Sequence, residues 1–378
     1  MLHDKKFWLA LATLVGTIIG VGIFSLPYLA IQTSFWLMLL YLISLGAFAI
    51  IMQLVYGEIV LKTPGRHQIS GYAARYLGMN WKKLTFAAEF LAITGILTAY
   101  LIIGGDFLYQ LLGPYLGGSL NLYIAIYFIL RAALVFGGIK SISQFELGLL
   151  LLLGLTILVL FVTNISKISW PLASLGTMHW LAPYGAVLFS LFGATVIPEV
   201  TDILGPARRY LKTIIISSVS SAVVLYLLFI ITVGGLSGAG STPDALFGLH
   251  GLVTPLTLMI FLGLGVITTG TAFIGLGGAA ERALMADWHL PRPLAWLFSC
   301  ALPPILYLLG ARNFISIISL VGAVFGGGLS IILLLIYLKV KRQGMASGEY
   351  SLRLPDWLVG LFILILLGGV ASAIVGLK

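Results

Sequence analysis

Residues 20–29 of this 378-residue chain read GVGIFSLPYL, and they lie inside a run without a charged residue from Phe7 to Gly57. Such a run is long enough to cross a bilayer, which takes about 20 apolar residues in a helix. Two glycines and a proline nevertheless interrupt it, although backbone groups freed at membrane depth cost several kcal/mol each when unsatisfied. The interruption therefore indicates a place where protein or a water-filled cavity supplies partners for the backbone.

The composition decides the class of protein. Hydrophobic residues make up 60% of the chain and charged residues only 9%, with a mean hydropathy of +1.11, whereas roughly a quarter of the residues in a soluble domain are charged. Apolar runs of 18 or more residues recur along the whole chain. A single cysteine, Cys300, implies neither a disulfide framework nor a cysteine-based metal cluster. The sequence predicts an all-α integral membrane protein with no structural metal and no cofactor beyond a coupling ion.

The apolar runs predict about eleven transmembrane helices. The hydrophilic stretches between them are too short for a domain of typical size, although residues 243–250, PDALFGLH, predict a short outer helix or turn. The third and eighth runs are long enough to tilt or to project into the cytoplasm. The predicted spans are residues 7–31, 35–61, 84–112, 120–136, 143–163, 182–203, 212–236, 254–284, 292–309, 314–338 and 355–376.

The distribution of Lys and Arg predicts the orientation of the chain. With the N-terminus inside, 17 of the 21 basic residues fall in cytoplasmic loops and three, Lys167, Arg312 and Lys378, fall outside, while Arg131 lies within a span. Because cytoplasmic loops carry the excess of Lys and Arg, we expect a cell-membrane protein with its N-terminus in the cytoplasm and its C-terminus outside. The net charge of +9 then reflects topology in a lipid bilayer and not a nucleic-acid partner.

The spacing of glycine and proline in the first span recurs in the sixth. Gly22 and Pro27 lie five residues apart, and so do Gly193 and Pro198, which follow 171 residues later. Adding this offset to the starts of spans three, four and five gives 255, 291 and 314, against assigned starts of 254, 292 and 314; span two fits less well, with 206 against 212. Five spans are an odd number, so the second copy is inverted, as in secondary transporters. The repeat predicts three parts: residues 1–163, the inverted copy 182–340, and 341–378 with an additional helix.

Two broken helices at matching positions predict a binding site near the middle of the membrane. Half-helix N-termini suit a carboxylate, whereas unwound carbonyls and half-helix C-termini suit a cation or an ammonium group. Close helix packing is the alternative for the first break, since Gly16 and Gly20 form a small-xxx-small pair. The candidate substrate-binding residues are Thr17, Ile19, Gly20, Val21, Gly22, Phe189, Phe192, Gly193, Ala194 and Thr195.

Charged side chains within spans are candidates for ion coupling or gating. Glu58 lies near the inner end of span two, where a salt bridge with Lys62 is the alternative. Glu199 is either a gate or proton carrier, or a residue that favours the first turn of a half-helix. Asp106 lies in the outer part of span three, where we expect a gate or a surface role. Two further acids have no assigned role, Glu89 and Asp202.

Threonines cluster in span eight. Thr268 and Thr271 lie three residues apart and share a helix face. Their hydroxyls either bond back to helix carbonyls, which is common, or contribute to a hard-cation site with carbonyls from the break in span one. The alternatives for the coupling ion are therefore Na⁺ near Gly20 and Thr271, or H⁺.

Four stretches of the chain match the motifs of a known family. They are GTIIGVGIFSLPY (16–28), YGEIVLKTPGRHQISGYAARYLG (56–78), AYLIIGGDFL (99–108) and FGATVIPEVTDIL (192–204). They resemble the amino acid/auxin permease family, and most closely the prokaryotic aromatic and neutral amino acid permeases of the amino acid–polyamine–organocation superfamily. The resemblance covers essentially the whole chain.

The resemblance implies the five-plus-five inverted-repeat fold of the bacterial leucine transporter, with one extra C-terminal helix. It implies that the backbone of residues 19–22 binds the substrate carboxylate and that carbonyls of residues 192–195 bind its ammonium group. In the superfamily, cation ligands in span eight are often adjacent hydroxyl residues, but here Ala272 follows Thr271. One expected hydroxyl is absent, which leaves proton coupling open.

The sequence thus predicts a secondary active transporter of neutral or aromatic amino acids, driven by H⁺ or Na⁺ and working by alternating access. A channel or scramblase is the first alternative, but the spans show neither a ring of pore acids nor a continuous polar face. A transporter-like amino acid sensor is the second. An enzyme is not expected, since no acid or base lies next to Cys300 in the sequence to activate it. The sequence does not predict the oligomeric state.

Overall fold

The structure is a computed structural model that describes residues 5–65, 67–138, 143–169, 178–343 and 349–375. In this part of the chain every regular element is a helix, and the predicted all-α class is confirmed. Six of the described helices are long and apolar enough to cross a membrane, or seven if the bent first pair is one span. In chain order the α-helices are α1 (Lys5–Ile18), α2 (Leu26–Gln32), α3 (Phe35–Lys62), α4 (Ile69–Leu77), α5 (Met79–Leu116), α6 (Leu120–Phe136), α7 (Ser143–Asn164), α8 (Ala182–Ser190), α9 (Ile197–Leu204), α10 (Leu211–Phe229), α11 (Gly235–Ser237), α12 (Pro255–Trp288), α13 (Arg292–Leu308), α14 (Phe314–Leu320), α15 (Gly327–Arg342) and α16 (Asp356–Val375).

The first predicted span is broken where its glycines lie. Helix α1 ends at Ile18, and after Gly20, whose backbone is extended, the chain continues as the 3₁₀ helix η1 (Val21–Ser25) and then as α2. The two halves meet at an angle of 44°. Pro27 lies in the first turn of α2, where its missing N–H leaves no helical bond unmade.

The sixth predicted span is broken in the same way. Helix α8 ends at Ser190, and after Gly193 the chain forms the 3₁₀ turn η2 (Ala194–Val196) and then α9, with Pro198 in its first turn. The matching spacing of glycine and proline therefore predicted both breaks correctly. The starts of α6 and α13, and of α7 and α14, also agree with an offset of about 171 residues.

Two features between α3 and α5 differ from the predicted spans. Helix α5 begins at Met79 and not at residue 84, because its first turn continues with polar residues beyond the apolar run. Helix α4, which precedes it, was not predicted at all. It is amphipathic, with Ile69, Tyr72 and Ala73 buried on one face. The predicted length of spans three and eight is confirmed by α5 and α12, with 38 and 34 residues, and residues 243–250 contain the predicted outer turn as the 3₁₀ helix η6 (Phe247–Leu249).

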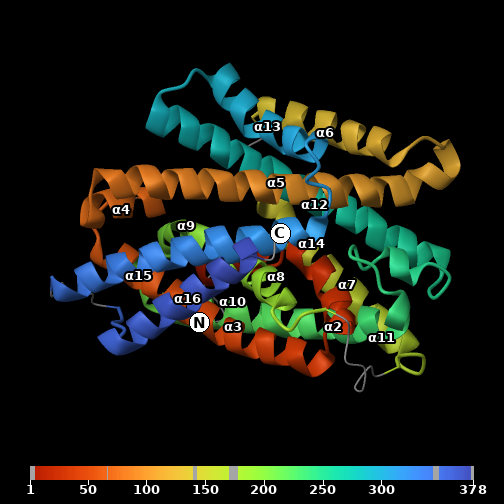
Figure 1. Cartoon of the computed structure of the whole chain (residues 1–378), viewed down its shortest axis with the longest axis horizontal. Helices are drawn as coiled ribbons and strands as arrows, with labels where there is room; N and C mark the ends of the chain where they lie inside the picture. The colour runs from red at the N-terminus through yellow and green to blue at the C-terminus, as the bar shows by residue number, and fades with distance from the viewer. Residues whose placement is uncertain (1–4, 66, 139–142, 170–177, 344–348, 376–378) are drawn as a thin grey trace.

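The helices form two groups that face each other (Figure 1). Helices α5, α6, α12 and α13 pack on one another, and α1, α3, α9 and α10 form a second packed set. Both broken helices belong to the second set, and α5 runs along the boundary between the groups. This arrangement brings the two breaks together in the interior of the molecule.

Candidate functional site

The two breaks cross each other at their glycines. A Cβ atom on Gly22 would overlap the Oγ atom of Ser190 and lie 3.1 Å from Cδ1 of Phe189. In return, a Cβ atom on Gly193 would lie 2.5 Å from Cγ1 of Ile18. Each broken helix thus presents a glycine to the other, and any larger residue would separate them.

The crossing also bears on the two interpretations of the glycines in span one, a binding site or close helix packing. Gly16 has open space where a Cβ would stand, so it takes no part in close helix packing. Gly20 lies next to the hydroxyl of Tyr100, which would be 3.1 Å from an added Cβ. Close packing therefore explains Gly22, while the alternative of a small-xxx-small pair is not supported, because nothing lies within 4 Å of a Cβ atom on Gly16.

The ends of the two first half-helices meet at one side chain that the sequence did not indicate. The hydroxyl of Tyr226, in α10, lies 2.8 Å from the carbonyl oxygen of Ile18 and 2.7 Å from that of Ser190. These carbonyls end α1 and α8, where the last C=O groups of a helix lack partners and carry partial negative charge. Tyr226 is one of 16 tyrosines, and nothing in its local sequence distinguishes it.

A second polar side chain supports the sixth-span break from α3. The amide of Gln53, which is buried, donates to the carbonyl oxygen of Leu191 at 3.3 Å. Leu191 lies in the unwound segment between α8 and η2. Gln53 and Leu191, with Phe192 and Ala194, line a small cavity between α3, α8 and α15.

The inner half of span six has one polar face. Thr195, Glu199 and Asp202 are exposed, while Ile197, Pro198, Val200 and Thr201 between them are buried. Positions four and three residues apart lie on one side of a helix. Polar and ionised groups are costly in contact with lipid tails, so this face is a candidate for contact with water or with other polar groups.

The predicted substrate-binding residues are brought together around the crossing, with one qualification. Ile19, Gly20, Val21 and Gly22 form the unwound segment and the first turn of η1, and residues 189–195 form its counterpart in span six. The first N–H groups of η1 have no partner within their own helix, which is the geometry that suits a carboxylate. The hydroxyl of Thr17, by contrast, donates to the carbonyl of Thr13 at 2.8 Å within α1.

Aromatic rings pack beyond the first break, on the side of α2. Phe24, two residues beyond Gly22, packs edge-on against Phe107 of α5, with ring centroids 4.9 Å apart. It also packs against Phe229 of α10, with centroids 6.0 Å apart. The three rings lie beyond the first break in the direction of α2.

The threonine hydroxyls of α12 bond back to carbonyls of their own helix, which was one of the two alternatives for them. Thr268 donates to the carbonyl of Leu264 at 2.8 Å, and Thr271 donates to the carbonyl of Thr268 at 3.0 Å. Thr269 accepts a hydrogen bond from the hydroxyl of Tyr127 at 3.0 Å. The guanidinium of Arg131, the basic residue predicted within a span, packs on Gly270 between these threonines. The positive charge of Arg131 therefore lies against the Gly270 side of α12, which is not the face that Thr268 and Thr271 share.

Asp106 is joined to an outer loop through an amide. Gln110 of α5 donates from one nitrogen to Asp106 and to Asp244, each at 2.9 Å. Asp244 lies in the segment between α11 and α12, is buried, and also accepts the backbone N–H of Phe247 at 2.9 Å. Asp106, for which we expected a gate or a surface role, is thus linked through Gln110 to Asp244. The sequence did not suggest this link, because Asp244 is 138 residues from Asp106.

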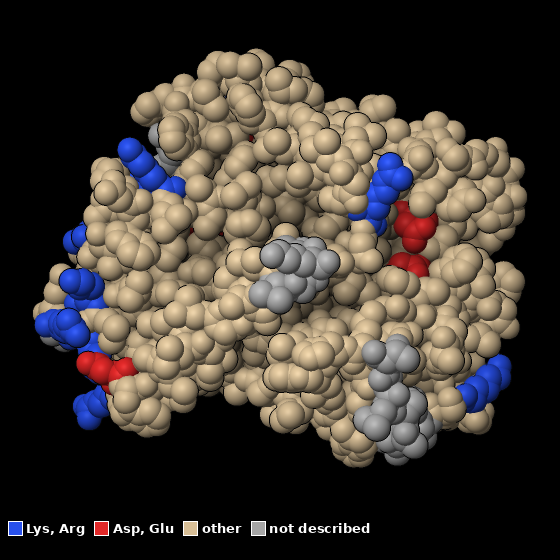
Figure 2. Space-filling model, viewed as in Figure 1, with Lys and Arg blue, Asp and Glu red and all other residues tan. Residues whose placement is uncertain are grey.

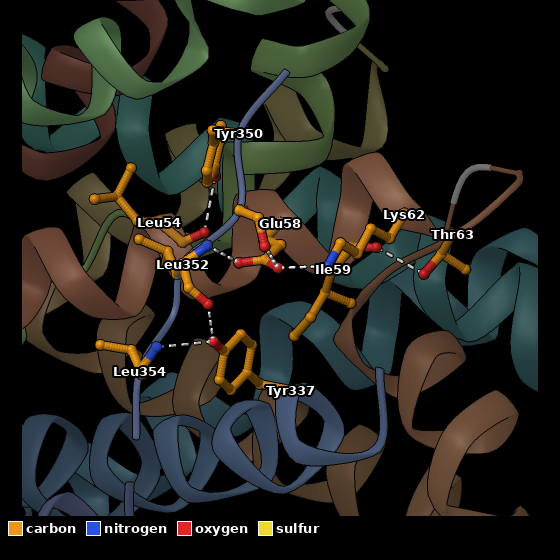
Figure 3. A network of polar contacts seen from close by, with 10 residues as sticks. Leu54, Glu58, Ile59, Lys62, Thr63, Tyr337, Tyr350, Leu352 and Leu354 are labelled. Atoms are coloured by element: carbon orange, nitrogen blue, oxygen red, sulfur yellow. Dashed lines mark hydrogen bonds and ion pairs between the residues drawn. The ribbon is translucent and has the colours of Figure 1, made fainter. Parts of the chain in front are cut away.

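Glu58 is buried in a polar network at the inner end of α3 (Figure 3). It forms the predicted pair with Lys62, at 2.6 Å, and accepts the backbone N–H of Leu352 at 2.7 Å and the hydroxyl of Ser351 at 3.2 Å. Tyr350 donates to the carbonyl of Leu54 at 2.8 Å. Burial, and then the Glu58 carboxylate, hold the pKa of Tyr350 well above its ordinary value, so its hydroxyl stays protonated. The network attaches the segment before α16 to α3. Of the two alternatives for Glu58, it favours the salt bridge with Lys62.

Solved structures share this fold. The chain aligns with Mhp1, a nucleobase-cation-symport-1 family transporter in a closed conformation with bromovinylhydantoin bound, at 14% identity and a TM-score of 0.64, over 98% of this chain and 90% of that one. It aligns with MhsT in complex with L-phenylalanine at 14% identity and a TM-score of 0.64, over 97% of this chain and 99% of that one. A manganese transporter from Eremococcus coleocola aligns at 16% identity and a TM-score of 0.66, over 99% and 89% of the two chains. These likenesses confirm the predicted leucine-transporter-type fold.

The sequence comparisons identify the family. A search among curated protein sequences gives no match. A family model described as the tryptophan/tyrosine permease family matches residues 3–240, which is more than half of the chain and includes both breaks. The resemblance to aromatic amino acid permeases is thereby confirmed, and the chain belongs to the tryptophan/tyrosine permease family.

Proposed function

We propose that this permease binds its amino acid where the two broken helices cross and moves it by alternating access, coupled to an ion. Membership of the tryptophan/tyrosine permease family makes the chain a secondary transporter of aromatic amino acids. The observation that carries the location of the site is the reciprocal contact of Gly22 with Ser190 and of Gly193 with Ile18. This contact supports the proposal because it brings the start of η1 next to the end of α8, and recognition of a zwitterion requires helix-start N–H groups and helix-end carbonyls near one point.

The carboxylate and the ammonium group of the substrate would bind to different backbone segments of this crossing. The N–H groups at the start of η1, from Val21 and Gly22, suit the carboxylate. The unwound carbonyls of residues 192–195 suit the ammonium group. Half-buried Phe189 and Phe192 offer ring surface to an aromatic side chain.

The exposed polar face of span six gives this site a route to the inner side. Thr195 lies at the break, and Glu199 and Asp202 continue along the same face of α9. On the outer side, Phe24 packs on Phe107, and Gln110 links α5 to the loop that carries Asp244. These contacts support a state that is closed outward, and alternating access requires that they break when the site faces outside.

Our proposal favours H⁺ over Na⁺ as the coupling ion. The Thr268 and Thr271 hydroxyls bond within α12. Ala272, which follows Thr271, also lacks the hydroxyl expected of a cation site in span eight. Glu199, exposed in the first turn of α9, is our candidate proton carrier.

The proposed orientation places the N-terminus in the cytoplasm and the C-terminus outside the cell membrane. Figure 2 shows Lys and Arg side chains gathered at one end of the visible face, with few at the other. Helix α4 and the last turn of α15, which carries Lys339, Lys341 and Arg342, lie at that same end in Figure 1. This distribution agrees with the excess of basic residues in cytoplasmic loops.

Uptake into proteoliposomes tests the function and the ion together. The purified protein would be reconstituted and supplied with labelled tryptophan or tyrosine under an imposed pH gradient, an imposed Na⁺ gradient, or neither. We expect accumulation driven by the pH gradient and abolished by a protonophore. Accumulation with Na⁺ alone would overturn the proton assignment. Folded protein that accumulates no aromatic amino acid under any gradient would overturn the proposed function.

A further inference from the structure

Tyr226 occupies a place in the fold that no motif predicts. Its side chain comes from α10, which belongs to neither broken helix, and it is completely buried. The hydroxyl lies within hydrogen-bond distance of Ile18 and Ser190, the last residues of α1 and α8. It is therefore the point at which a third helix holds the ends of two half-helices.

A count of hydrogen atoms shows why this contact is unusual. A tyrosine hydroxyl has a single hydrogen and can donate it to one acceptor at a time. The carbonyl of Ile18 also accepts the backbone N–H of Gly20 at 3.0 Å, whereas no backbone donor reaches the Ser190 carbonyl within the described residues. The Oγ atom of Ser190 does not supply one, since it donates to the carbonyl of Ala186 at 2.8 Å. The Tyr226 hydroxyl is therefore the donor for the Ser190 carbonyl, and its oxygen, which also lies 2.8 Å from the Ile18 carbonyl oxygen, fixes the separation of the two helix ends.

The surrounding contacts link the distance between the ends of α1 and α8 to the geometry of the candidate site. Ser190 packs against Gly22, whose N–H lies at the start of η1, and Ile18 packs against Gly193. One turn further along α10, Phe229 packs on Phe24, beyond the same break. Helix α10 therefore holds the first broken helix on both sides of its break, through a hydroxyl on one side and a ring on the other.

We propose that Tyr226 is a positioning residue for the substrate amino acid. Its hydroxyl sets the distance between the ends of α1 and α8, and so the relative position of the backbone groups that bind the two ends of the zwitterion. This inference rests on the proposed function. It assigns to Tyr226 no direct contact with the substrate, because the hydroxyl is buried behind the two helix ends.

The test is the substitution Tyr226→Phe, which removes one oxygen and keeps the ring. Tyr56 gives a matched control, because it is also completely buried and its hydroxyl has no hydrogen-bond partner within the described residues. Both variants and the wild type would be purified in detergent. The dissociation constant for tryptophan and the melting temperature without ligand would be measured for each.

We expect Tyr226→Phe to bind tryptophan about tenfold more weakly, the effect of one lost buried hydrogen bond on a binding constant, and to melt at a slightly lower temperature, because the buried Ser190 carbonyl loses its donor. Tyr56→Phe should match the wild type in both measurements. Unchanged affinity in Tyr226→Phe would overturn the inference, and so would a lowered melting temperature with unchanged affinity, which would make the tyrosine merely structural. If Tyr226→Phe does not fold, Tyr226→His takes its place, because histidine keeps a donor near the ring edge. For this variant too we expect weaker binding of tryptophan with only a small change in melting temperature. A wild type that binds no aromatic amino acid would overturn the proposed function itself.

Discussion

Gly22 of η1 lies against Ser190 of α8 so closely that its missing Cβ atom would overlap the serine Oγ. The two residues are far apart in sequence, and each stands at the break of its own helix. Their contact is what allows the two unwound segments to share one site. It also explains why glycine occupies this position, where φ is ordinary but space is absent.

Replacing Gly22 by alanine tests this contact. The added methyl group must displace Ser190, and such overpacking typically costs about 1–3 kcal/mol. We expect Gly22→Ala to lower the melting temperature of the purified protein and to abolish uptake of tryptophan.

Gly16 provides the matched control for that substitution. It lies within α1, and nothing stands within 4 Å of the place where its Cβ would be. Alanine is favoured over glycine inside a helix by about 1 kcal/mol. Gly16→Ala should therefore transport normally and melt at the same or a higher temperature. Equal losses in both variants would show that the crossing has no special demand for space.

The Glu58 network predicts a structural effect and not a coupling effect. Glu58→Gln leaves the Lys62 ammonium, which is also buried, without its carboxylate. Loss of one partner of a buried ion pair costs about 3 kcal/mol. We expect a markedly lower melting temperature and faster proteolysis of the segment before α16, while the ion dependence of the remaining uptake is unchanged.

Asp356 supplies the comparison for Glu58. It pairs with Lys341 at 2.7 Å but is largely exposed, so its loss should leave stability unaffected. Asp356→Asn is thus expected to melt like the wild type. A change of coupling ion in Glu58→Gln would return this residue to the ion-coupling role.

The amide of Gln110 predicts how the outer loop is held. Gln110→Leu removes the hydrogen bond to Asp106 within α5 and the hydrogen bond that joins α5 to Asp244. Hydrogen bonds to charged groups are among the stronger ones, so we expect amide exchange of residues 244–249 to become about tenfold faster.

Gln68 is the corresponding control, because it is exposed and its side chain makes no capping hydrogen bond to α4. In Gln68→Leu the exchange of the outer loop should stay as in the wild type. If Gln110→Leu also exchanged at the wild-type rate, the loop would be held by other contacts and Gln110 would not form part of an outer gate.

The sequence predicted most of the fold because membrane spans have a strong local signal. Apolar runs placed the helices within a few residues, and the Gly–Pro spacing placed both breaks. Helix α4 was missed because the hydrophilic stretch around it was treated as a loop. Its signal was nevertheless present, since Ile69, Tyr72 and Ala73 recur at helical spacing and are the buried residues of α4.

The polar contacts of the site could not be predicted from the sequence, because they join residues from separate helices. Tyr226, Gln53 and Asp244 lie 36, 138 and 134 residues from their partners Ser190, Leu191 and Gln110. Nothing local distinguishes a membrane tyrosine that bridges two helix ends from one that packs among apolar neighbours. Such contacts follow only from the packing of the whole bundle.

The central claim, that an aromatic amino acid binds at the crossing of the two broken helices, is tested most directly at Thr195. Thr195 is exposed at the break, and the single native cysteine, Cys300, is buried, so Thr195→Cys introduces one reactive thiol. The rate of its labelling by a maleimide would be measured against tryptophan concentration, with Lys83→Cys, exposed near the start of α5, as the reference. We predict saturable protection of the thiol at residue 195 by tryptophan and none at residue 83. Labelling at residue 195 that is independent of tryptophan, in protein that binds it, would contradict the account.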